Sequence, residues 1–123
     1  MRLFCYKAMC GDAFHLQYVG ESDKRRNIFL DMGHPMTYTQ VLKGVISRLD
    51  RSTEKIDVLF LSHIHDDHIG GASKFIRDIQ NDSAIGDIVG RWIYNAPMML
   101  NTQMTRKLES YAGLSPEIKF MNI

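Results

Sequence analysis

At 123 residues, the chain is long enough for one compact domain at most. Its 45% hydrophobic and 24% charged residues are an ordinary globular balance, and a formal net charge of +1 gives no field that recruits nucleic acid or an anionic membrane. No apolar run approaches the ~20 residues that a membrane-spanning helix needs. Cys5 and Cys10 form no zinc or redox motif, so we expect reduced thiols in a cytoplasmic protein.

The first third of the chain predicts three strands. Residues 2–8 and 13–19 have strand composition and are joined through a turn-favouring Gly-Asp pair. The polar segment 20–26 predicts a further turn. Residues 27–31 then form a short apolar strand, which Gly33 follows as a breaker.

A helix and a buried strand come next. Thr37 is the predicted N-cap of the helix, with Gln40 three residues later as its capping-box partner. The apolar stripe of this helix has helical spacing and consists of Val41, Leu42, Val45, Ile46 and Leu49. Residues 56–61 are almost continuously apolar, which predicts a strand buried on both faces.

Four side chains that can bind metal follow this strand within six residues: His63, His65, Asp67 and His68. Imidazole and carboxylate groups suit a borderline divalent ion such as zinc, with manganese or iron(II) as alternatives. His63 and His65 are two residues apart, so they project to the same side of an extended segment. Asp67 and His68 are adjacent and diverge, which places them to serve a second ion. The sequence therefore predicts one or two metal ions at this loop.

The remaining elements complete an alternating order. Gly70 and Gly71 allow close backbone approach at the start of a helix whose apolar stripe is Ala72, Phe75, Ile76 and Ile79. Residues 88–94 predict a strand, Asn101 or Thr102 begins a further helix that ends at Gly113, and residues 117–123 form a last strand. The order predicts an α/β fold with a mixed β-sheet and helices on one face.

The metal-binding run resembles the signature of a known family. The residues His63-Ile64-His65-Asp66-Asp67-His68 match the H-x-H-x-D-H motif of the metallo-β-lactamase fold hydrolases. Ser62 before the motif, and the strand ending in Asp31-Met32-Gly33, are also similar to that family. Gly11-Asp12-Ala13 looks like a hairpin of the branch related to the hydrolase domain of the DNA-uptake protein.

This resemblance implies a site and a reaction. By similarity, His63 and His65 bind the first zinc ion, and Asp67 and His68 bind the second. The implied chemistry is hydrolysis, in which Asp67 acts catalytically by orienting the attacking water or accepting its proton.

Asp31 and Ser62 are expected to support the metal ligands rather than to bind the ion. A carboxylate at a strand end can hold the metal loop by hydrogen bonds. We interpret His15 as structural and His34 as a surface residue.

The resemblance also implies an expectation about domain boundaries. The family builds a four-layer αββα sandwich with further ligands late in the domain, and this sequence has no histidine after His68. We therefore interpret residues 1–123 as the N-terminal portion of such a domain, lacking the C-terminal half. The exposed sheet face that this leaves would include some of Val58, Phe60, Ile88, Trp92 and Tyr94.

Three functional hypotheses follow. The first is a zinc-dependent hydrolase, or the N-terminal portion of one, whose isolated chain is expected to be impaired in activity. Its substrate would be a small molecule or phosphodiester, with thioesters and lactam-type amides as further substrate classes. The second is a catalytically incomplete module that binds metal weakly and acts through association. The third is pairing of two copies, or docking of a complementing C-terminal half, on the bare sheet face. No membrane partner is expected, and the sequence leaves nucleic acid open.

Overall fold

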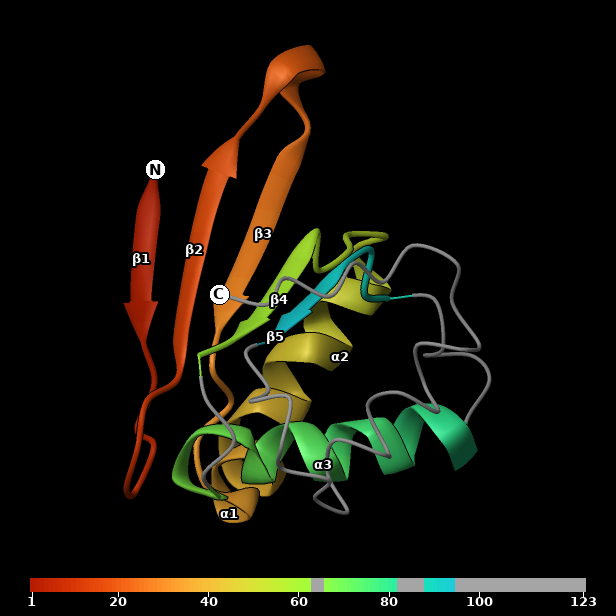
Figure 1. The fold of residues 1–123 in the computed structure, drawn as a ribbon. Coiled ribbons are helices and arrows are strands. Elements are labelled where there is room, and N and C mark those ends of the chain that lie inside the picture. Colours follow the sequence, from red (N-terminus) through yellow and green to blue (C-terminus); the bar gives the residue numbers. More distant parts are fainter. Residues whose placement is uncertain (63–65, 82–87, 95–123) are drawn as a thin grey trace.

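The computed structural model describes residues 1–62, 66–81 and 88–94, apart from the side chains of residues 66, 67 and 69. Within these residues the chain forms a five-stranded sheet in the order β1-β2-β3-β4-β5 (Figure 1). The strands are β1 (Arg2–Cys5), β2 (Phe14–Val19), β3 (Arg25–Leu30), β4 (Val58–Leu61) and β5 (Trp92–Tyr94). The pairs β1–β2 and β2–β3 are antiparallel, whereas β3–β4 and β4–β5 are parallel. The mixed sheet predicted from the sequence is confirmed.

A long helical segment links β3 to β4. It consists of α1 (Pro35–Thr37), a π-helical stretch η2 (Tyr38–Leu42) and α2 (Lys43–Arg51), while α3 (Asp66–Asn81) links β4 to β5. A short 3-10 helix, η1 (Glu21–Asp23), lies in the β2–β3 connection. The helices lie on one face of the sheet, as expected (Figure 1). Among the described residues, no helix is long and apolar enough to cross a membrane.

The predicted N-cap at Thr37 is wrong. The helix begins at Pro35, whose fixed φ suits the first helical position. His34 is the N-cap, and its Nδ1 accepts a hydrogen bond from the backbone N–H of Met36 at 3.3 Å. Thr37 is instead buried inside the first turn and donates its hydroxyl proton to the carbonyl of Ala8 at 2.8 Å.

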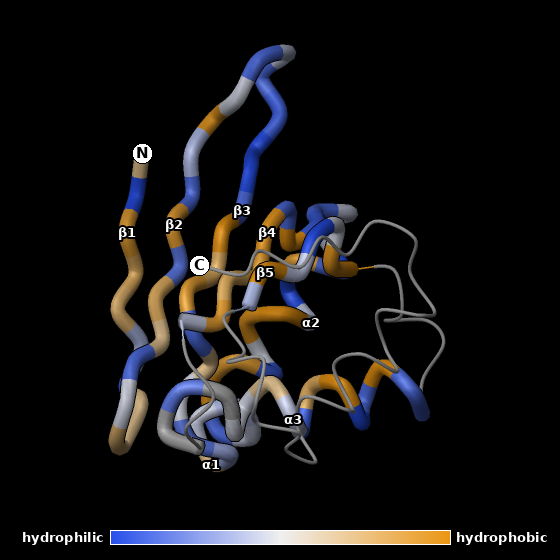
Figure 2. Tube along the Cα trace, in the orientation of Figure 1, coloured by the Kyte–Doolittle hydropathy of each residue, from blue (hydrophilic) through white to orange (hydrophobic). Residues whose placement is uncertain are grey.

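The core lies between the sheet and the helices. Along one row of the sheet, His15, Phe29, Leu59 and Trp92 are paired in register, so they share the helix-facing side. Phe75 of α3 stacks on Trp92 with ring centroids 6.0 Å apart. Figure 2 shows hydrophobic segments along β4, β5 and α2. The hairpin that β2 and β3 form extends away from the helices, and the start of β3 in this distal hairpin is hydrophilic. The contact between Phe75 and Trp92 packs α3 against β5.

The opposite side of the sheet carries a continuous apolar surface, here called the outer face. Seven residues line it: Leu3, Phe14, Leu16, Ile28, Leu30, Val58 and Phe60. Leu3 is 63% exposed and Leu30 is 36% exposed. The expectation that residues 56–61 are buried on both faces is therefore wrong for Val58 and Phe60, which are only half-buried.

Two of the five residues proposed for an exposed sheet face lie on the outer face, namely Val58 and Phe60. The other three are buried, which corrects the expectation for Ile88, Trp92 and Tyr94. The strand register explains two of these, because Trp92 pairs with Leu59 and Tyr94 with Leu61, both of which face the helices. The helix and strand expected after residue 100 lie outside the described residues.

Candidate metal centre

The candidate centre lies where β3 and β4 end and α3 begins. The two strands run parallel, so their carboxyl ends meet at one edge of the sheet. Asp31 directly follows β3, and its backbone N–H donates to the carbonyl of Phe60 at 2.8 Å. Asp31 then adopts a left-handed φ of 57°, which costs a non-glycine residue ~1–2 kcal/mol. This turn directs the Asp31 side chain toward Ser62, which directly follows β4.

The Asp31 carboxylate contacts both of the other described residues of the predicted site, Ser62 and His68. Its side chain is buried, with the residue 2% exposed. One oxygen, Oδ1, accepts a hydrogen bond from the backbone N–H of Ser62 at 2.7 Å. The other, Oδ2, accepts from the Ser62 hydroxyl at 2.6 Å and lies 3.0 Å from Nδ1 of His68. Asp31 therefore ties the end of β4 to the first turn of α3.

These contacts assign the proton on the His68 ring. A carboxylate oxygen accepts hydrogen bonds, so the short contact with Asp31 places the proton on Nδ1 of His68. With the proton on Nδ1, the acceptor nitrogen of the imidazole is Nε2. Histidines that bind metal usually donate their second ring N–H to a carboxylate or carbonyl, which fixes tautomer and orientation. The donor set thus fits a divalent ion bound through Nε2.

Close backbone packing holds α3 against the turn after β3. Met32 donates its N–H to the carbonyl of His68, and Gly71 donates to the carbonyl of Gly33, both at 2.9 Å. A Cβ atom on Gly71 would overlap the carbonyl of Met32. One on Gly70 would overlap the Pro35 ring. The predicted close approach at this glycine pair is confirmed, and it places His68 beside Asp31.

Asp12 is a site residue that sequence reasoning did not assign. Its Oδ2 lies 3.8 Å from Nδ1 of His68, and its side chain is 51% exposed. Asp12, Asp31 and His68 each offer a ligand atom within 4.8 Å of the others, so the three form a group that could hold a metal ion. The one sequence signal was the Gly11-Asp12-Ala13 hairpin, which indicates a turn but not its position.

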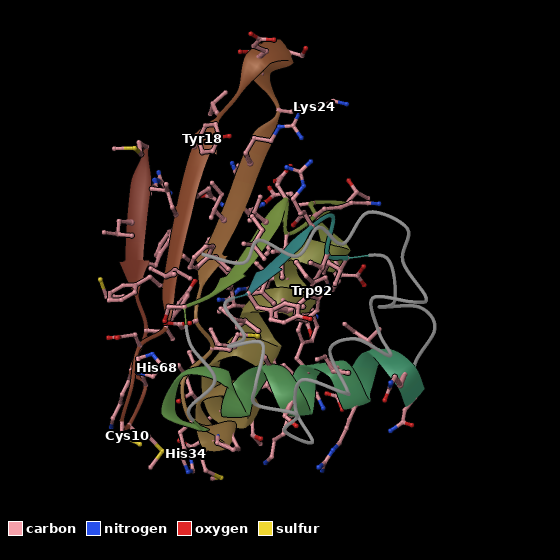
Figure 3. All side chains as sticks on the ribbon, viewed as in Figure 1. Cys10, Tyr18, Lys24, His34, His68 and Trp92 are labelled. Atoms are coloured by element: carbon pink, nitrogen blue, oxygen red, sulfur yellow. The ribbon has the colours of Figure 1, made fainter. Side chains whose placement is uncertain are left out.

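The predicted ligands are only partly within the described residues. His63 and His65 lie outside them, and of Asp67 only the backbone is described, in the first turn of α3. Figure 3 shows His68 at the same end of the molecule as Cys10 and His34, with Tyr18 and Lys24 at the opposite end. The four-residue metal site therefore remains a prediction, and the Asp31–Ser62–His68 cluster is its described part.

His15 has the structural role that was expected. It is buried, its Nε2 lies 2.9 Å from the Asn27 side-chain oxygen, and its Nδ1 lies 3.0 Å from the Tyr6 hydroxyl. Its ring also stacks on Phe29, with centroids 4.3 Å apart. Because the Asn27 Oδ1 only accepts, the proton of His15 lies on Nε2 and Tyr6 donates to Nδ1. Desolvation lowers the pKa of His15, against the opposing effects of Asn27 and Glu54.

A mixed sheet with helices on one face, and an aspartate–histidine cluster at the ends of its parallel strands, define an α/β protein with a group of side chains that could hold a metal ion. The sequence model of the metallo-beta-lactamase superfamily matches residues 11–118. The chain therefore belongs to the metallo-beta-lactamase superfamily. The match specifies no finer branch, and a search of curated proteins found no match.

Proposed function

We propose that the protein is a zinc-dependent hydrolase whose metal is held by His63, His65, Asp67 and His68. Membership of the superfamily supports the reaction class. The observation that carries the proposal is the 3.0 Å contact between Asp31 and Nδ1 of His68, the carboxylate–imidazole pairing that is usual for a histidine that binds metal through its other nitrogen.

In this proposal, Asp31 and Ser62 act by orienting His68, the one proposed metal ligand whose side chain is described. Asp31 is itself fixed by the backbone and hydroxyl of Ser62, so it presents His68 in one orientation. The close packing of Gly71 in α3 against the turn after β3 also keeps His68 beside Asp31. When bound, zinc lowers the pKa of water and stabilises negative charge that develops during hydrolysis. We assign to Asp67 the role of orienting the attacking water or accepting its proton.

The substrate class is tested with three chromogenic compounds: a bis(nitrophenyl) phosphate, an aryl thioester and a β-lactam. We expect zinc-dependent turnover of at least one of them, abolished by a chelator and restored by zinc. Asp67→Asn should lower kcat by roughly 100-fold, the lower range for loss of a general base. Asp23→Asn is the matched control, because it removes the same charge in the distal hairpin. Activity that survives chelation, or equal activity in the two variants, would refute the proposal.

The outer face supports a second candidate, an association module that binds metal weakly. All seven of its lining residues are apolar, so a second copy of this chain would meet no like charge there. The two candidates differ in metal content: a hydrolase retains zinc through dialysis, whereas the association module loses it. Zinc retained at one ion or more per chain would exclude the second candidate.

A further inference from the structure

The turn between β1 and β2 is shaped by contacts with other elements. The backbone N–H of Tyr6 donates to the carbonyl of Ala13 at 2.9 Å and closes the turn. The Thr37 hydroxyl, from the first helix, donates to the carbonyl of Ala8 at 2.8 Å. Ala13 is 2% exposed and belongs to the core. The position of Asp12 is therefore constrained by a backbone bond within the turn and by a bond from the first helix.

These contacts bring a second carboxylate to one imidazole nitrogen. Nδ1 of His68 lies 3.0 Å from Oδ2 of Asp31 and 3.8 Å from Oδ2 of Asp12. The shorter contact is a hydrogen bond, and the longer one is an electrostatic contact beyond hydrogen-bond length. Nε2, the nitrogen through which His68 would bind a metal, is on the other side of the ring from Nδ1. The three side chains are close enough to share one ion, but the proton on Nδ1 points toward the carboxylates. Asp12 is thus placed as a partner of His68 rather than as a ligand that shares its ion.

We propose that Asp12 is a positioning residue of the metal centre, acting through His68. This proposal rests on the proposed metal-dependent function. Its charge attracts the Nδ1–H edge of the ring and so restricts the imidazole to the orientation that Asp31 selects. It also adds a second negative charge beside the site, and a divalent cation offsets the repulsion between the two carboxylates. The metal affinity of the protein therefore depends on a residue more than fifty positions before His68 in the sequence.

Zinc affinity of the full chain, measured by competition with a chromophoric chelator, tests this role. We expect Asp12→Asn to weaken zinc binding by about 10-fold, the lower end of the effect of removing a partner of a metal ligand. Asp12→Glu keeps the charge and should restore most of the affinity. Asp23→Asn makes the same change of net charge in the distal hairpin and should bind zinc like the wild type.

A second measurement separates positioning from folding. The thermal midpoint of metal-free Asp12→Asn should match that of the metal-free wild type, because the Asp12 side chain is half-exposed. Equal zinc affinities of Asp12→Asn and Asp23→Asn would overturn the inference and leave the proposed function intact. A metal-free midpoint that falls with the affinity would also overturn it, since a structural role would then suffice. If the wild type itself binds no zinc, the proposed function fails as well.

Discussion

Replacing Gly71 with alanine tests whether the close approach of α3 to the turn after β3 holds the site together. The new methyl group would overlap the backbone carbonyl of Met32, which has no flexible end that can move aside. Overpacking of this kind costs roughly 1–3 kcal/mol. Loss of the 2.9 Å bond from Gly71 to the carbonyl of Gly33 adds about 1 kcal/mol. The helix propensity of alanine offsets ~1 kcal/mol of this, so we expect a net destabilisation of roughly 1–3 kcal/mol.

Gly44→Ala is the matched control, because Gly44 lies in α2 and a Cβ atom there meets nothing within 4 Å. Only the propensity term acts, so this variant should be more stable than the wild type by about 1 kcal/mol. Urea unfolding followed by circular dichroism measures both changes. A Gly71→Ala variant as stable as Gly44→Ala would refute the reasoning, because it would mean that α3 can move away from Met32 at no cost.

Two further predictions concern pH and association. Burial lowers the pKa of His15 below its ordinary 6.5, so the unfolded chain binds the proton first and stability falls as the pH drops below about 6.5. The urea midpoint of the wild type should therefore decrease when the pH is lowered from ~7.5 to ~5.5, and that of His15→Gln should decrease less. An equal decrease in both proteins would exclude His15 as the cause. The outer face should drive association at low micromolar concentration, which Leu16→Lys reduces in light scattering. A wild-type monomer that binds no hydrophobic dye would contradict this.

Local patterns in the sequence predicted most of the described fold. The apolar runs gave β3 and β4, and the helical spacing of Phe75, Ile76 and Ile79 gave α3 with the correct buried side. The signal was strong because burial and periodicity are set within a few residues of the chain. The mixed sheet followed from the order of these elements.

The features that were missed depend on contacts between distant residues. Thr37 has the composition of an N-cap, but the bond to Ala8 places it in the interior, and Pro35 starts the helix earlier. The proximity of Asp12 to His68 is invisible to periodicity, since it is produced by a turn packed against α1. Which face of the sheet Trp92 lies on depends on its pairing register with β4. The alternation of residues along one strand does not determine that register.

Zinc content of the purified chain, measured by elemental mass spectrometry after dialysis, tests the central claim most directly. The wild type should retain at least one zinc ion per chain, because a zinc site needs about three protein ligands and the four proposed residues supply them. The double variant His63→Ala/His65→Ala should retain no stoichiometric zinc. If the double variant keeps the wild-type metal content, the metal lies elsewhere in the chain and the assignment of this centre is wrong.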